Sequence, residues 1–311
     1  MSEGEGEPER VDRLPPIRIG GIDYLNALPL TRYLEAGGDP PLEVFNHVPS
    51  ILADSLRSGA LDVALVPVVE YLARPEYRVV PGICIASYGE VRSIRLFYRR
   101  PIAELRRIGL DECSRTSVLL TKLLCRGLWR VAPEFRAVSP AQACRALEEA
   151  GGRREENGAG FDGAAACDAL LLIGDAALCA RPSPAWEAVD LGTVWTSWTG
   201  LPFVYAFWVW RGQGRPVEGL ERRLHEAKAK GRARIDDIVR ERSSILGIEP
   251  ADCLHYLSRV IQYDLEPLQV QGLLEFFRRL ETLEASRAPP HALRAGKERL
   301  QWLDEPVSPP A

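Results

Sequence analysis

The sequence lacks the features that define several classes of protein. Its seven cysteines are an odd number without a Cys-x-x-Cys pair, so we expect reduced thiols and neither a disulfide framework nor a cysteine metal site. No basic run accompanies the net charge of −4, which argues against a nucleic-acid partner. No apolar run is long enough to span a membrane, and the acidic segment Met1–Arg10 does not resemble a secretory signal. We therefore expect a cytoplasmic protein with no membrane partner.

Histidine and glycine-rich motifs are also scarce. The four histidines, at positions 47, 225, 255 and 291, fall outside the segments that we identify below as site candidates, so a nucleophilic triad has no support. No Gly-x-Gly-x-x-Gly motif follows a predicted strand. The sequence therefore predicts no dinucleotide cofactor and no metal.

What the sequence does contain is a regular alternation of strand and helix patterns. Leu61–Val66 is nearly all apolar, which predicts a strand buried on both faces of a parallel sheet. Strands and helices alternate on both sides of it and again after residue 107, which predicts an α/β fold with open sheets. Beyond the linker Gly212–Pro216 the pattern is helical, in the stretches 217–246, 250–262 and 266–285.

Two similar β/α sets joined by two long strands, 91–98 and 203–210, predict two lobes around a central cleft. The division that we expect is a disordered tail at 1–15, a first lobe at 16–97 plus 205–285, a second lobe at 98–204 and a loose tail at 286–311. In open α/β sheets, ligands bind beyond the carboxyl ends of the strands.

One segment between a predicted strand and a predicted helix combines three hydroxyl groups with an arginine: Ser114, Arg115, Thr116 and Ser117. Ser114 is a natural N-cap, and Gly127 stands where the helix would end. A helix N-terminus suits an anion, and an arginine adds a bidentate donor for a carboxylate or phosphate. Taken alone, the segment favours a plain capped helix with a solvated arginine.

Other small polar residues also stand at strand-to-helix turns, and together they raise the odds of a binding site. They are Asn26, Ser50, Ser87, Asp175 and Thr199. If they converge from both lobes, they describe a pocket for a small anionic ligand.

Six blocks stand in order along the chain: Tyr24–Leu30, Gly59–Pro67, Gly89–Ser93, Leu110–Ser117, Leu172–Leu178 and Asp190–Phe203. In their sequences and their order they resemble the chorismate dehydratase family, the first enzymes of the futalosine route to menaquinone. Ser114–Ser117 and Trp198–Phe203 are the most specific of these sequences. The match runs from about residue 17 to residue 210, and the C-terminal helices match only in kind.

The resemblance implies a type II periplasmic-binding-protein-like fold, with C-terminal helices, that has become an enzyme. It implies that chorismate, a small dicarboxylate, loses water to give 3-[(1-carboxyvinyl)oxy]benzoate, with no redox or metal cofactor. Whether the protein is a homodimer stays open.

The same resemblance suggests roles for individual residues. Asn26 and Ser93 would be catalytic and would hydrogen-bond the departing hydroxyl, while Ser114–Ser117 would bind a substrate carboxylate. Asp175 either contacts substrate or simply caps the helix that follows it, and Thr199 with Gly200 either contacts substrate or forms a tight turn.

The matched blocks hold no strong base, so the substrate's own side-chain carboxylate is our candidate for the proton acceptor. Three alternatives remain. The first is 1,4-dihydroxy-6-naphthoate synthase of the same pathway, whose base is a histidine. The second is a non-catalytic carboxylate-binding protein, and the third, weaker one is a cytosolic ligand-sensing domain.

Overall fold

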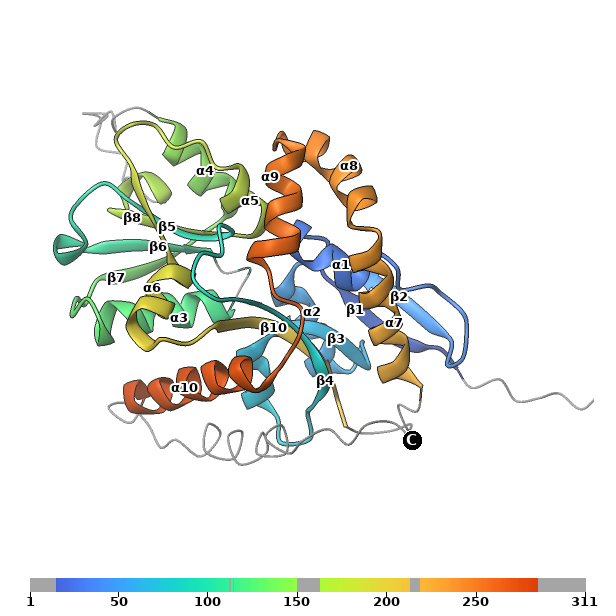
Figure 1. Cartoon of the computed structure of the whole chain (residues 1–311). Helices are drawn as coiled ribbons and strands as arrows, with labels where there is room; N and C mark the ends of the chain where they lie inside the picture. The colour runs from blue at the N-terminus through green and yellow to red at the C-terminus, as the bar shows by residue number, and fades with distance from the viewer. Residues whose placement is uncertain (1–14, 112, 114, 150–162, 213–218, 285–311) are drawn as a thin grey trace, which may run out of the picture.

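The computed structural model describes residues 15–111, 113, 115–149, 163–212 and 219–284. The tails expected at 1–15 and 286–311 lie outside these residues, apart from Pro15. Within the described residues the chain forms two five-stranded sheets, one in each of two lobes (Figure 1). The expected two-lobed α/β architecture is confirmed.

The first sheet has the strand order β2-β1-β3-β10-β4. Its strands are β1 (Ile17–Gly21), β2 (Leu42–Asn46), β3 (Val63–Pro67), β4 (Arg78–Ser87) and β10 (Phe203–Trp210). β1 runs parallel to β2 and β3, and β10 lies antiparallel between β3 and β4. Every residue of β3 is buried, as its apolar sequence predicted.

The second sheet repeats this layout in the order β7-β6-β8-β5-β9. Its strands are β5 (Ile94–Tyr98), β6 (Arg107–Asp111), β7 (Glu134–Val138), β8 (Ala169–Ile173) and β9 (Glu187–Asp190). β6 is parallel to β7 and β8, whereas β5 is antiparallel to both of its neighbours. The strands β10 in the first sheet and β5 in the second each follow directly after a segment of the other lobe.

The strands expected to join the lobes each belong to one sheet only. β5 pairs with β8 and β9 in the second sheet, although the expected boundary at residue 97 placed most of it in the first lobe. β10 lies wholly in the first sheet, including Phe203 and Val204. The crossings are therefore short turns before these strands. Asp190 fixes one of them, because its carboxylate accepts the backbone N–H groups of Val91 and Arg92.

The helices of the two lobes begin and end with the expected signals. In α2, Pro49 occupies the first turn and Gly59 ends the helix at a φ of 85°. α6 was not predicted, yet the Asp190 side chain caps it by accepting the N–H of Thr193. The lobe helices are η1 (Leu25–Ala27), α1 (Leu28–Thr31), α2 (Pro49–Ser58), η2 (Val68–Ala73), η3 (Ile102–Glu104), α3 (Arg115–Gly127), α4 (Pro140–Glu148), η4 (Ala164–Ala166), α5 (Gly174–Cys179) and α6 (Leu191–Thr199).

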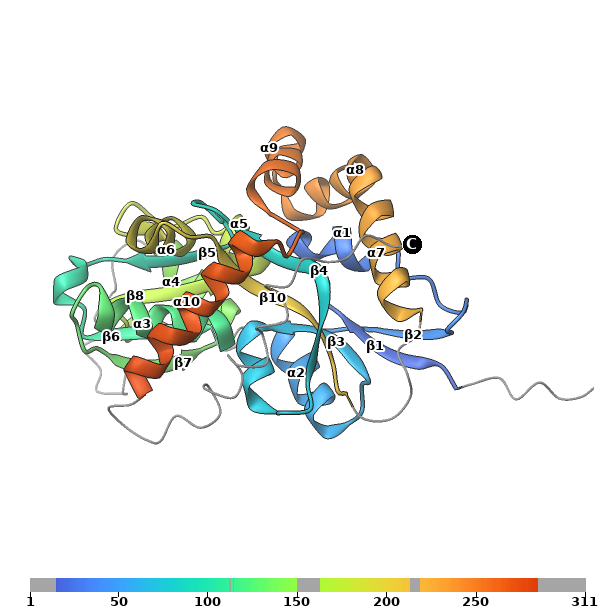
Figure 2. The same cartoon turned by 60° about the horizontal axis from the view of Figure 1, so that its bottom comes forward.

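The C-terminal helices pack across both lobes. They are α7 (Leu220–Ala233), α8 (Ile235–Leu246), α9 (Pro250–His255), the π turn η5 (Tyr256–Val260) and α10 (Pro267–Glu284). The stretch expected to be helical over 217–246 contains two helices, because the chain breaks at Arg234 between α7 and α8. α10 lies along α3 and β10 (Figure 2). At Gly272 its backbone comes so close to the Pro202 carbonyl that a Cβ would lie 2.0 Å from the oxygen.

Candidate functional site

The carboxyl ends of strands from both sheets meet where the lobes touch. In the first lobe, β1 leads into η1 and β3 leads into η2; in the second, β6 leads into α3 and β8 into α5. Two direct contacts join these turns across the lobes. The Leu25 N–H donates to Asp175 Oδ1 at 2.9 Å, and Arg115 Nη1 lies 2.6 Å from Glu70 Oε1. Strand-end turns of the two lobes are therefore in direct contact.

Asn26 and Ser93 lie on opposite sides of this boundary, and both adjoin the Gly174–Asp175 turn. Asn26 follows Leu25 in η1, which Asp175 of the second lobe holds. Ser93 stands just before β5, and its carbonyl accepts the N–H of Gly174, the residue before Asp175. One turn thus links the segments that carry the two predicted catalytic residues.

The Ser93 hydroxyl is an unusual group for a protein interior. Ser93 has no exposed surface, and its Oγ makes no hydrogen bond of normal geometry within the described residues. A buried hydroxyl without a partner costs about 1–3 kcal/mol, so such groups need an explanation. A substrate hydroxyl or a leaving water would supply the missing partner.

The N-terminus of α3 presents a second group of this kind. Thr116 is fully buried and its Oγ1 has no partner among the described residues, while Ser117 beside it is 1% exposed. The first backbone N–H groups of a helix have no partner inside the helix and carry partial positive charge. This end of α3 therefore suits a carboxylate. Ser114, the predicted cap, lies outside the described residues.

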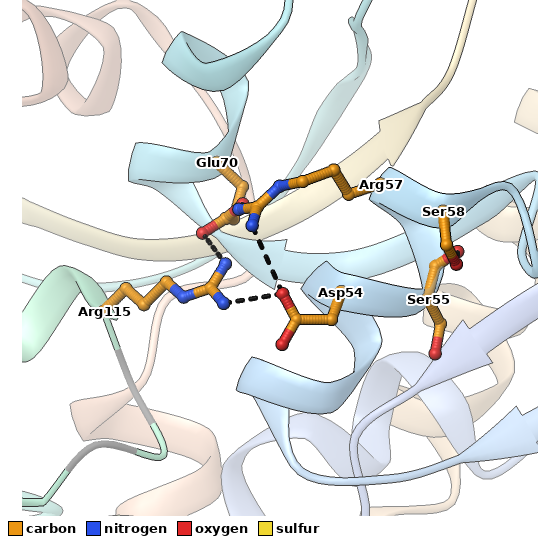
Figure 3. A network of polar contacts seen from close by, with 6 residues as sticks. All are labelled: Asp54, Ser55, Arg57, Ser58, Glu70 and Arg115. Carbon is orange, nitrogen blue, oxygen red and sulfur yellow. Dashed lines mark hydrogen bonds and ion pairs between the residues drawn. The ribbon is translucent and has the colours of Figure 1, made fainter.

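Arg115 has partners other than the predicted substrate carboxylate. Its Nη1 lies 2.6 Å from Glu70 Oε1 and its Nη2 lies 2.7 Å from Asp54 Oδ1, both in the first lobe (Figure 3). Arg57 contacts the same two carboxylates from within the first lobe, at 2.6 Å for Glu70 and 3.3 Å for Asp54. In this conformation the guanidinium of Arg115 connects the lobes.

Asp175 also makes contacts within the protein. One of its oxygens accepts the Leu25 N–H, and the other lies 3.8 Å from Arg242 in α8. Burial raises the pKa of the Asp175 carboxyl, although the Leu25 hydrogen bond and Arg242 oppose this change. The sequence left two interpretations open for Asp175, a substrate contact or a cap of the following helix. Neither includes these contacts, because a helix cap would bond to its own helix. The carboxylate positions the turn that carries Asn26.

Thr199 and Gly200 lie at the end of α6. The Thr199 hydroxyl donates to the Trp195 carbonyl and accepts the Leu201 N–H, which are the local contacts of a tight turn. Gly200 ends the helix at a φ of 71°, and its carbonyl accepts the Tyr88 hydroxyl at 3.4 Å. The tight turn that the sequence suggested is present, and the predicted contact of these residues with substrate stays a prediction.

Sequence reasoning missed Tyr256, which the structure brings to the predicted catalytic pair. Burial raises the pKa of Tyr256 well above its usual value, and polar contacts with the side chains of Ser93 and Asn26 oppose this increase. Tyr256 also lines, with Leu25, a hollow of about 550 Å³ between the second lobe and the α8–α9 segment. No motif marks this tyrosine, because it lies among the C-terminal helices, where the chain matches the family only in the kind of secondary structure.

The described residues form no cluster of three or more histidine, cysteine, aspartate or glutamate side chains that could hold a metal ion. Over the same residues, no helix has both the length and the apolar character that crossing a membrane requires.

The fold defines the class of protein. Protein AF1704 from Archaeoglobus fulgidus matches with a TM-score of 0.69 and 14% identity over 87% of this chain and 98% of its own. The periplasmic aliphatic sulphonate binding protein SsuA from Escherichia coli gives a TM-score of 0.55 and 14% identity, with 90% and 91% of the two chains covered. The chain thus has a periplasmic-binding-protein-like fold, as predicted.

The sequence then places the chain within a family. The family model described as menaquinone biosynthesis matches residues 17–152 and 155–282, so the chain belongs to this family. The chorismate dehydratase of Thermus thermophilus is 30% identical over 280 residues, which are 84% of this chain and 94% of that protein. Both findings support the resemblance on which the site prediction was based.

Proposed function

We propose that the protein is a chorismate dehydratase, a hydro-lyase that converts chorismate to 3-[(1-carboxyvinyl)oxy]benzoate and water. Its relationship to the Thermus thermophilus enzyme supports the reaction. The buried Ser93 hydroxyl, which makes no hydrogen bond of normal geometry within the described residues and shares Tyr256 as a polar neighbour with Asn26, supports the site, because a dehydration requires hydrogen-bonding groups around the departing hydroxyl.

The proposed reaction removes a proton from C3 of the ring and a hydroxide from C4. The C3–H electron pair first delocalises into the ring carboxylate, and the C4–O bond then breaks as the ring becomes aromatic. The N-terminus of α3, with the Thr116 hydroxyl, stabilises the charge that develops on the ring carboxylate. Asn26 and Ser93 hold the departing hydroxyl, and the side-chain carboxylate of chorismate accepts the proton, so that one water is released.

The histidines disfavour the sister enzyme, whose expected base is a histidine. Among the described residues, His47 is exposed and accepts the N–H of Val48. His225 contacts the Pro81 carbonyl at 3.1 Å, and His255 is exposed on α9. No recorded contact brings any of the three to Asn26 or Ser93.

The direct test is to incubate the protein with chorismate and to follow the aromatic product by absorbance and chromatography. We expect turnover by the wild type, and a loss in kcat of at least about 100-fold for Asn26→Ala and for Ser93→Ala. Ser243→Ala is the matched control, because Ser243 is also a buried serine but lies within α8 and is none of the predicted site residues. We expect its kcat to stay within about twofold of the wild type.

Two outcomes would contradict the proposal. Tight binding of chorismate without product would indicate a carboxylate-binding protein. Turnover that survives both Asn26→Ala and Ser93→Ala would show that the reaction takes place with other residues.

A further inference from the structure

Tyr256 is a buried tyrosine whose hydroxyl has no obvious structural purpose. The residue is 2% exposed, and its hydroxyl makes no hydrogen bond of normal geometry within the described residues. The side chains of Ser93 and Asn26 are among its polar neighbours, and η5 packs against η1, which carries Asn26. The three groups are therefore neighbours without a hydrogen bond of normal geometry between them, which is common in active sites before substrate binds.

The fold holds Tyr256 in this place through an irregular piece of backbone. Tyr256 begins the π turn η5, and the turn closes with the Ile261 N–H donating to the Tyr256 carbonyl at 3.0 Å. The next residue, Gln262, exchanges two backbone hydrogen bonds of 2.8 and 2.9 Å with Ala86 of β4. π turns are rare and occur frequently at functional sites. The segment is thus anchored to the strand that precedes the lobe crossing, and η5 packs against η1.

The chemistry of a phenol suits this location. A tyrosine hydroxyl can donate one hydrogen bond and accept others, and burial keeps it protonated over the working range of pH. It can therefore donate to one member of the Asn26–Ser93 pair and fix that group's orientation toward the substrate. Neither residue has another recorded side-chain partner within the described residues that would do this.

We propose that Tyr256 is a positioning residue of the dehydration site, whose hydroxyl orients the Ser93 hydroxyl and the Asn26 amide toward the departing C4 hydroxyl of chorismate. The inference rests on the proposed function, and it gives the C-terminal helical segment a part in arranging the catalytic groups.

The test compares Tyr256→Phe with Tyr263→Phe. Tyr263 is a matched control because it is 3% exposed, follows in the same segment and likewise has a hydroxyl without a partner in the described structure. We expect Tyr256→Phe to lower kcat by about 10- to 100-fold while KM for chorismate stays within twofold, because small displacements of catalytic groups cost this much. We expect Tyr263→Phe to keep wild-type kinetics. Equal melting temperatures for the two variants would show that folding is intact.

A double-mutant cycle separates positioning from a general loss of structure. If Tyr256 acts through Ser93, adding Tyr256→Phe to Ser93→Ala costs little more activity than Ser93→Ala alone. Fully multiplicative losses in the double variant would overturn the inference, as would wild-type kcat in Tyr256→Phe. If the wild type itself does not convert chorismate, the proposed function fails instead, and the two failures are distinct.

Discussion

At the scale of single residues, Gly174 shows why the site requires glycine at one position. Its φ of 59° lies in the left-handed region, and a Cβ there would come within 2.8 Å of the Tyr24 ring. The two residues that Gly174 contacts, Tyr24 and Ser93, both matter for the site. Tyr24 precedes the Asn26 turn, and the Ser93 carbonyl accepts the Gly174 N–H. The residue must therefore be both conformationally free and small.

We predict that Gly174→Ala destabilises the protein by about 2–5 kcal/mol, the sum of left-handed strain and overpacking. Gly200→Ala is the control, since Gly200 has a φ of 71° but nothing within 4 Å of the position of a Cβ. Gly200→Ala should be destabilised only by the left-handed strain, about 1–2 kcal/mol. Urea unfolding of both variants measures the difference, and equal losses would contradict a role for Tyr24 packing.

Part of this candidate site was predicted from residue types at strand ends and part from the family resemblance. Asn26, Ser93 and the Ser114–Ser117 segment stand in recognisable blocks at strand ends, and the structure brings Asn26 and Ser93 to one boundary. The partners of Arg115 and the position of Tyr256 could not be predicted. Both depend on segments far away in the sequence, and local patterns carry no information about them.

At the scale of elements, the contact between α3 and the α2–η2 region is a network of two arginines and two carboxylates. Glu70 is only 3% exposed, and Arg57 and Arg115 both contact it at 2.6 Å. A buried carboxylate that loses a partner is strongly disfavoured. The two arginines differ in one respect, since Arg57 belongs to the same lobe as the carboxylates and Arg115 to the other.

We predict that Arg115→Ala shifts the protein toward a more open arrangement of the lobes, whereas Arg57→Ala does not. Each change removes one arginine from the same carboxylates, so Arg57→Ala controls for lost charge. Small-angle scattering should show a larger radius of gyration for Arg115→Ala, and added salt should reduce the difference from wild type. Equal radii for the two variants would show that the network does not connect the lobes.

The pattern of elements was more predictable than their boundaries. Strands such as β3 and helices such as α2 follow from apolar periodicity and from proline and glycine at their ends. The break at Arg234 and the π turn at Tyr256 follow from tertiary packing, which overrides a continuous helical pattern. α6 was missed because its residues are largely β-branched or aromatic, types that favour strands.

At the scale of the whole molecule, α10 connects the C-terminal segment to the second lobe. Arg279 of α10 stacks on Trp198 of α6, with its guanidinium carbon 3.7 Å from the ring centre. Glu275 orients Arg279 through a contact of 2.6 Å. Hydrogen bonds from Arg278 lower the pKa of Glu275 from 4.5 to about 2, Arg279 contributes to the same effect, and partial burial opposes it.

This shift predicts a pH-dependent contribution to stability. A carboxylate with a lowered pKa stabilises the folded state above its unfolded value, and the contribution disappears as the pH falls from about 4.5 to about 2. Glu275→Gln should lower the free energy of unfolding at pH 7 by at most about 1 kcal/mol, because the pair is partly exposed. Near pH 2 the variant and the wild type should be equal in urea unfolding. A difference that persists at pH 2 would contradict the ionic origin.

The hydrogen bond from Leu25 to Asp175 has a consequence for the timing of the reaction. It crosses from one lobe to the other immediately before Asn26, so the two lobes must be together for this turn to be held. In the proposed mechanism, separation of the lobes would break this bond and release the turn that carries the Asn26 amide. Admission of substrate and readiness to react would then exclude each other, and elimination would begin only in the closed arrangement.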